Sequence, residues 1–89
     1  MRYLLIDFRR IADMAEFHRY IAEALKFPDY YGKNLDALFD CLTDVDEPHT
    51  LVLMNVPEEA GALGGRLEAL LSVLNSASIE NSNIVIKTL

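Results

Sequence analysis

Three short runs of apolar residues, separated by segments with helical spacing, most constrain how this chain can fold. The runs lie at residues 3–6, 51–54 and 84–86. Near-continuous apolar runs of this length are typical of parallel strands that are covered on both faces. The segments between them are long enough to cross back over a sheet, and such crossovers are right-handed. We therefore predict an α/β fold with a three-stranded parallel sheet, in the order β-α-α-β-α-α-β.

About four helices are expected between these strands. Asp13, with Glu16 three residues later, predicts the start of the first helix, and Pro28 predicts its end. Asn34 is a suitable N-cap for a second helix that reaches about Thr43. The apolar stripe of the first helix consists of Met14, Phe17, Ile21 and Leu25. This spacing favours helices packed on the sheet.

Two further helices are expected after the second strand. Pro57 suits the first position of a short helix, which the glycines that follow would break. A leucine stripe at helical spacing predicts the last helix; it consists of Leu67, Leu70, Leu71 and Leu74. The breaking glycines are Gly61, Gly64 and Gly65. A chain of 89 residues is enough for one domain, so we predict a single domain over residues 1–89.

Composition narrows the setting in which this domain works. Apolar residues make up 52 % of the chain, which allows a packed core. Cys41 has no second cysteine to pair with, which suits a reducing cytosol, and we predict a cytoplasmic protein. The apolar run near the N-terminus is shorter than a signal peptide requires, and no run reaches the length of a membrane span.

The charge of the chain excludes some classes of partner. Fourteen acidic and eight basic side chains give a net charge of −6. Such a surface repels phosphate backbones and anionic membranes, so we expect neither direct nucleic-acid binding nor membrane binding. It would attract a basic protein, although acidity also serves solubility alone.

Three aspartates form a row along the second predicted helix. Asp36, Asp40 and Asp44 are four residues apart, and helical geometry separates them from the leucines that face the core. Like charges at this spacing destabilise an isolated helix by roughly 0.2–0.5 kcal/mol per pair. Local rules that a sequence breaks often mark a functional site, so the surroundings of this row decide its meaning.

Four interpretations of the row are open. It is a solvated helix face, a divalent-metal site, a general acid/base pair or a protein-binding face. A metal site has only Asn34 as an obvious further oxygen donor, and an acid/base pair needs a substrate cleft, for which 89 residues leave little room. His18 is predicted on the exposed side of the first helix and His49 in a turn, so neither is a predicted catalyst. We predict no cofactor and no metal.

The binding interpretation uses the aromatic residues beside the row. Tyr30, Tyr31 and Phe39 flank the carboxylates, so the face mimics a nucleic acid, with carboxylates for phosphates and rings for bases. Such a face would fit the basic cleft of a nuclease, where arginines pair with carboxylates through charge-assisted hydrogen bonds. Tyrosines would supply the aromatic anchors.

The segment P-D-Y-Y-G-K-N-L-D-A-L-F-D-C-L-T, at residues 28–43, resembles the signature segment of the barstar family of small intracellular ribonuclease inhibitors. The resemblance implies a three-stranded parallel sheet with packed helices, no enzymatic activity, and a basic ribonuclease as partner. It implies that the second helix and the loop before it block the ribonuclease active site. Asp40 would be the central anchor and Asp36 would pair at the edge. The other matching positions are Tyr30, Gly32, Asn34 and Thr43.

The chain also departs from the family pattern. Phe39 stands where the best-known member has tryptophan, and Asp44 with Val45 replaces the familiar Gly-Trp pair. The family's additional glutamate on the last helix falls at Ser76, and Glu80 is the nearest acid. These departures affect the identity of the partner more than its class.

The first hypothesis is therefore a 1:1 inhibitor of a ribonuclease, which is either a secreted barnase-like enzyme or an interbacterial toxin domain. It would act as an immunity protein for the producing cell. The alternatives are an acidic module that binds a basic protein other than a nuclease, and a carboxylate-dependent metal-binding or hydrolytic protein.

Overall fold

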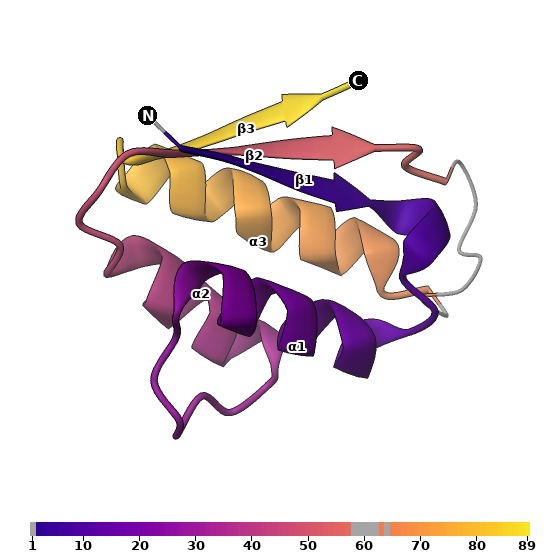
Figure 1. The fold of residues 1–89 in the computed structure, drawn as a ribbon, viewed down its shortest axis with the longest axis horizontal. Helices are drawn as coiled ribbons and strands as arrows, with labels where there is room; N and C mark the ends of the chain where they lie inside the picture. Colours follow the sequence, from indigo (N-terminus) through magenta and orange to yellow (C-terminus); the bar gives the residue numbers. More distant parts are fainter. Residues whose placement is uncertain (1, 58–62, 64) are drawn as a thin grey trace.

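The computed structural model describes residues 2–57, 63 and 65–89. In this part of the chain, a parallel sheet lies on one side and the helices lie on the other (Figure 1). The elements, in chain order, are β1 (Arg2–Asp7), a 3-10 helix η1 (Phe8–Arg10), α1 (Met14–Leu25), α2 (Leu35–Thr43), β2 (His49–Met54), α3 (Leu67–Glu80) and β3 (Ile84–Thr88). The predicted α/β fold class is confirmed.

The three strands are parallel and follow chain order, with β2 in the centre. Leu4 pairs with Leu51 across β1 and β2, and Leu51 pairs with Ile86 of β3. Because both crossovers step in the same direction across the sheet, crossovers of one hand place the helices on the same face.

The prediction that the first strand is covered on both faces is wrong. Tyr3 and Leu5 are 65 % and 56 % exposed, because they point away from the helices on the uncovered face of an edge strand. Only β2 is buried through its middle, at residues 50–53, since it has a strand on each side. A run of four apolar residues therefore did not distinguish an edge strand from a central one.

Both predicted helix starts are confirmed by their caps. The Asp13 carboxylate accepts a hydrogen bond from the Glu16 amide at 2.8 Å, and the Asn34 side chain accepts one from the Ala37 amide at the same distance. The first helix ends at Leu25, three residues before Pro28, because Lys26 takes a left-handed conformation with φ of 56°.

The helix count differs from the predicted four. The described residues contain three α-helices and η1, which the sequence patterns did not predict. Pro57 is not helical, and the rest of the predicted short helix, including Gly61 and Gly64, lies outside the described residues. The last predicted helix is α3, with Leu67, Leu70 and Leu74 buried as expected.

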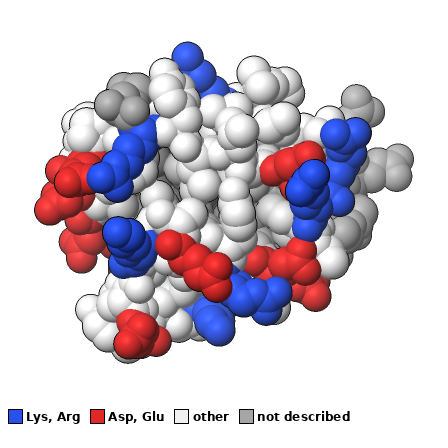
Figure 2. Space-filling model, viewed as in Figure 1, with Lys and Arg blue, Asp and Glu red and all other residues white. Residues whose placement is uncertain are grey.

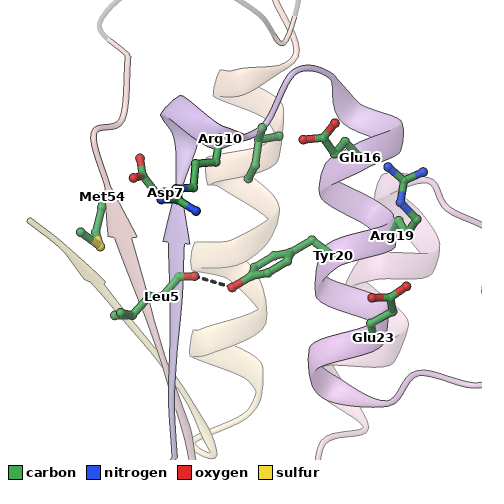
Figure 3. Close-up of a pocket in the computed structure, with 9 residues that line it drawn as sticks. Leu5, Asp7, Arg10, Glu16, Arg19, Tyr20, Glu23 and Met54 are labelled. Atoms are coloured by element: carbon green, nitrogen blue, oxygen red, sulfur yellow. Dashed lines mark hydrogen bonds between the residues drawn. The ribbon is translucent and has the colours of Figure 1, made fainter.

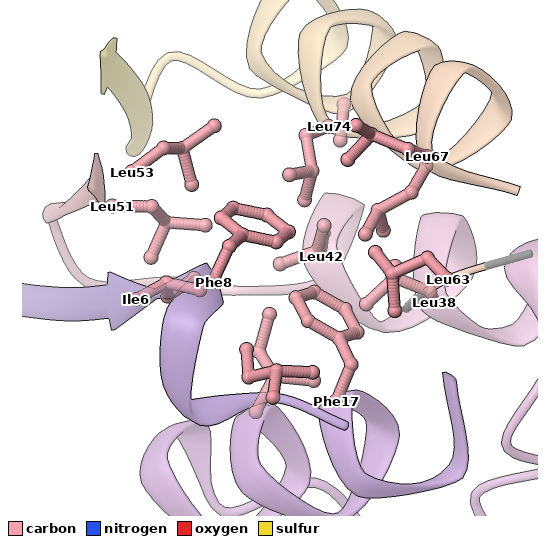
Figure 4. Packing of buried hydrophobic residues seen from close by; sticks show 14 of the residues in the cluster. Ile6, Phe8, Phe17, Leu38, Leu42, Leu51, Leu53, Leu63, Leu67 and Leu74 are labelled. Carbon is pink, nitrogen blue, oxygen red and sulfur yellow. The ribbon is translucent and has the colours of Figure 1, made fainter. Parts of the chain in front are cut away.

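The core fills the space between the sheet and the helices (Figure 4). Ile6, Leu51 and Leu53 of the sheet face Phe17 of α1, and Leu38 and Leu42 of α2 complete it. Leu38 and Leu42 are fully buried, and replacing a buried leucine by alanine typically costs 2–5 kcal/mol. This packing fixes α2 in rotation about its axis, so its opposite side is held towards solvent.

Candidate partner-binding surface

The outward side of α2 carries the predicted row of carboxylates. Asp36, Asp40 and Asp44 are exposed, while Leu38 and Leu42 on the other side are buried. Within the described part of the chain, none of the three carboxylates has an ion pair or a side-chain hydrogen bond. We call these three residues the acidic face. The repulsion between them is therefore not offset inside the protein.

The loop before α2, at residues 28–34, exposes one tyrosine and buries the other. Tyr30 is 87 % exposed, whereas Tyr31 is 8 % exposed and belongs to the core. The ring of Tyr30 is thus available to a partner, and that of Tyr31 is held inside. The sequence placed both tyrosines on the same face, because it does not show which way each side chain turns.

Gly32 and Asn34 shape the entry into α2. A Cβ atom at Gly32 would lie 3.1 Å from the Asn34 side-chain nitrogen, which donates a hydrogen bond to the Gly32 carbonyl at 3.3 Å. A side chain at position 32 would therefore press on the residue that caps α2. Asn34 caps α2 as the sequence predicts, and its contact with a partner stays a prediction.

Phe39 and Thr43 border the acidic face. Phe39 is half-buried and packs against the core. The Thr43 hydroxyl donates to the carbonyl of Phe39 at 2.9 Å and lies 3.1 Å from that of Asp40. It is thus held on the helix backbone, beside the carboxylate row.

Comparison with known proteins identifies the family. The profile of the family described as Barstar (barnase inhibitor) matches residues 1–88. A Bacillus subtilis (strain 168) protein named "Putative ribonuclease inhibitor YrdF" is 44 % identical over 81 residues, which cover 90 % of this chain and 89 % of that protein. The chain belongs to the barstar family.

A hollow of about 650 Å³ adjoins the acidic face of this barstar-family chain. Asp40 and Asp44 line it on the side of α2, and Tyr30 lines it on the side of the loop. Asp46 and Glu47 add further acidic groups, and Glu47 is paired with Arg2 at 3.6 Å. The departure from the family pattern at Asp44 therefore adds a carboxylate to the wall of this hollow.

Cys41 also lines the hollow, and its surroundings keep the thiol protonated. Burial raises the pKa of Cys41, and the nearby carboxylates of Asp40 and Asp44 raise it further. Because the thiolate is the reactive form, this cysteine is a poor nucleophile at neutral pH. Burial is the main cause of this low reactivity, and the acidic face adds to it.

A buried histidine lies behind the loop. His18 is 2 % exposed, so the prediction that it is on the exposed side of α1 is wrong. Its Nδ1 atom is hydrogen-bonded to the Tyr31 hydroxyl at 2.6 Å. Position 18 is four residues after Met14 and three before Ile21, so helical spacing already placed it on the apolar stripe of α1. The sequence analysis did not include it in that stripe because histidine is polar.

The end of α2 is held by amides that the sequence analysis treated only as turn residues. The Asn81 side chain donates to the carbonyls of Leu42 and Val45, both at 2.9 Å. The Asn83 side chain donates to the same Val45 carbonyl at 3.2 Å. These bonds fix the chain on both sides of Asp44. Ser76 and Glu80, the positions considered for the family's additional glutamate, are exposed on α3.

A second hollow lies between β1 and α1, away from the acidic face, and we call it the β1–α1 cleft (Figure 3). Its acidic residues, Asp7, Glu16 and Glu23, alternate with Arg10 and Arg19. Figure 2 shows that this side of the molecule mixes both charges around an uncharged centre. The Tyr20 hydroxyl crosses the cleft and donates to the Leu5 carbonyl at 2.6 Å.

The structure provides no grouping of at least three His, Cys, Asp or Glu side chains suited to a metal ion within residues 2–57, 63 and 65–89. In the same ranges, no helix has the length and apolar character needed to cross a membrane.

The predicted partner-binding residues lie on α2 and the loop before it, and among them Tyr31 is turned inward.

Proposed function

We propose that this barstar-family protein inhibits a basic ribonuclease by covering its active site with the acidic face and the loop of residues 28–34. The observation that supports this most is the acidic face itself. Three exposed carboxylates on one side of a rigid helix have no partner within the described part of the chain. Cationic groups that bind RNA phosphates would supply that partner.

Each residue of the face has a role in this proposal. Asp40, near the middle of α2, accepts hydrogen bonds from the basic groups of the enzyme's phosphate site. Asp36 pairs with a basic residue at the edge, and Tyr30 packs its exposed ring on a flat group of the enzyme. Thr43 and Phe39 border the contact, and Asp44 extends it into the neighbouring hollow.

The charge of the whole chain favours the encounter as well as the complex. The net charge of −6 attracts a basic enzyme over a distance and raises the association rate. Specific contacts on α2 then slow dissociation. The protein acts in the cytoplasm as a 1:1 inhibitor without catalytic activity of its own, and it protects the cell that produces the ribonuclease or meets it as a delivered toxin.

The direct test replaces the proposed anchor. Asp40→Ala should weaken inhibition of a basic, barnase-like ribonuclease by at least about 30-fold, since truncating an interface hot spot costs roughly 2 kcal/mol or more, a rule for which the barnase–barstar pair is itself an example. The free energy of unfolding should change by no more than about 0.5 kcal/mol, as for other exposed positions.

Glu23→Ala is the matched control. Glu23 is exposed on α1, loses the same charge, and lies in the β1–α1 cleft. It should inhibit as the unmodified protein does, within about threefold, because a remote charge changes mainly the association rate. Equal inhibition by Asp40→Ala and Glu23→Ala would refute the proposed face. Tight capture of a basic protein that has no nuclease activity would support the alternative of a general acidic binding module.

A further inference from the structure

The loop that carries Tyr30 has one buried side chain, which anchors it to the core. Of its seven residues, 28–34, six are exposed, and Tyr31 alone is buried. The Tyr31 amide donates to the Pro28 carbonyl at 2.9 Å and closes the turn whose tip includes Tyr30. The position of Tyr30 therefore depends on how firmly Tyr31 is held.

The side chain of Tyr31 is held on two sides. Its ring meets Phe27 edge-on, with the centroids 5.0 Å apart, and meets the His18 ring at 5.7 Å. Its hydroxyl is bonded to the His18 Nδ1 atom at 2.6 Å. Ring packing alone would permit sliding along the core, whereas a short buried hydrogen bond fixes the depth and direction of the ring.

The chemistry of this pair suits a permanent clamp. Burial lowers the pKa of His18, helped by the positive charges of Arg66 and Lys33, so the imidazole is neutral near pH 7. Burial also raises the pKa of Tyr31, so its hydroxyl stays protonated. A neutral imidazole and a protonated phenol form one complete donor–acceptor pair.

The anchor also controls the entry to α2. Only Gly32 and Lys33 separate Tyr31 from the Asn34 cap, and Lys33 takes a left-handed conformation with φ of 53°. Over so short a span, a shift of Tyr31 moves the cap and the first turn of α2. Tyr31 thus connects the turn that carries Tyr30 to the residues that begin α2.

We propose that His18 and Tyr31 are positioning residues of the inhibitory surface: their hydrogen bond fixes the loop so that Tyr30 and the acidic face are presented together before the ribonuclease arrives. This inference rests on the proposed function, because it assigns a role within that surface. Preorganisation of this kind improves affinity by reducing the ordering that binding requires.

Tyr31→Phe tests the hydroxyl without changing the ring. It should accelerate dissociation from a barnase-like ribonuclease by three- to tenfold and weaken the equilibrium affinity to match. Tyr20→Phe is the matched control, because it removes a tyrosine hydroxyl bond of the same 2.6 Å length from the β1–α1 cleft. It should leave the dissociation rate unchanged within twofold.

A double variant tests whether the two residues act together. His18→Leu should accelerate dissociation as Tyr31→Phe does, and the double variant should dissociate no faster, within twofold, than the single variant that dissociates faster. Residues that act through one shared contact show this lack of additivity. Effects that multiply in the double variant would contradict a single clamp.

Hydrogen exchange in the free inhibitor keeps the inference separate from the proposed function. In Tyr31→Phe, the amide at position 31 should exchange at least tenfold faster than in the unmodified protein, after correction for any change in the exchange of core amides. In Tyr20→Phe it should not. If the unmodified protein fails to bind the ribonuclease but this exchange result holds, the proposed function fails and the clamp stands. If Tyr31→Phe matches Tyr20→Phe in both measurements, the clamp is refuted.

Discussion

The acidic face of α2 and the β1–α1 cleft both carry three acidic side chains, yet their surroundings differ. In the cleft, Asp7 accepts hydrogen bonds from Asn55 and from the Arg9 amide, both at 3.0 Å. Glu16 accepts one from the Ala12 amide at 3.4 Å, and Arg10 and Arg19 are close by. The acidic face has no such bond within the described residues.

The difference separates two uses of a carboxylate. In the cleft, Asp7 and Glu16 hold the fold: hydrogen bonds and the Arg9 ion pair at 3.6 Å satisfy Asp7, and the Ala12 amide donates to Glu16. On α2, the acidic groups repel one another at a small cost to the helix, and only Asp36, in the first turn, is favoured by the helix dipole. The carboxylate oxygens that accept no hydrogen bond within the described residues are the ones that a basic partner would contact.

The largest expected effect comes from replacing carboxylates by isosteric amides, first on the acidic face and then in the β1–α1 cleft. Asp36→Asn with Asp40→Asn should weaken binding to a basic ribonuclease on the order of 100-fold or more, because two charge-assisted hydrogen bonds are lost. Glu16→Gln with Glu23→Gln removes the same charge from the cleft and should change the affinity only a few-fold. Isothermal titration of both double variants makes the comparison, and equal losses would show that only net charge matters.

Salt should separate the two groups next. The association rate of the unmodified protein should fall by about tenfold or more between low salt and 0.5 M salt. At the higher concentration the Debye length is only a few ångströms, so salt screens the attraction that guides the two proteins together. The double variant on α2 should show a clearly shallower dependence than the double variant in the cleft. Stopped-flow measurements at several salt concentrations provide the slopes. Association that is insensitive to salt would contradict steering by the acidic face.

The two helix caps offer a smaller and closely matched contrast. Asp13→Ala and Asn34→Ala each remove a side-chain cap bond of 2.8 Å, so each should lower the free energy of unfolding by about 0.5–2 kcal/mol. Only Asn34→Ala should also weaken binding, by several-fold, since Asn34 begins the helix that carries the acidic face. Urea unfolding and affinity measurements distinguish the effects. An equal loss of affinity in both variants would show that lower stability, and not the start of α2, weakens binding.

The smallest expected effect is a dependence of stability on pH. Burial lowers the pKa of His18 in the folded protein below its ordinary value of 6.5. The unfolded chain therefore takes up a proton first, and stability should fall as the pH drops below about 6.5. Asp7, whose pKa is lowered mainly by its bond to Asn55, should add its loss only below about pH 4.

Urea unfolding at closely spaced pH values separates these two steps. His18→Leu should remove the step near pH 6 and keep the one in acid. A variant that retains the full step near pH 6 would show that another group titrates there.

The sequence predicted the fold and the acidic face because both depend on local spacing. Apolar runs indicated the strands, and the geometry of one helix separated Leu38 and Leu42 from the aspartates. Helical spacing places His18 on the apolar stripe of α1, but its hydrogen bond to Tyr31 joins residues thirteen positions apart, which spacing within one element does not show. The exposed side of β1 was missed for a similar reason, since it depends on where the helices lie (Figure 1).

The two tyrosines of the loop show the same limit most clearly. Tyr30 and Tyr31 are adjacent and chemically identical, yet one is 87 % exposed and the other 8 %. The resemblance to the barstar family predicted the partner-binding surface, and the structure shows which of the two tyrosines is exposed and which is buried.

The most direct test of the proposed function is the mode of inhibition. Initial rates of a basic, barnase-like ribonuclease should be measured with an RNA oligonucleotide at increasing concentration, in the presence of a fixed amount of the inhibitor. If the acidic face occupies the active site, inhibition is competitive, and saturating RNA restores the full rate. Inhibition that saturating RNA leaves unchanged would contradict the account, because the inhibitor would then bind elsewhere on the enzyme.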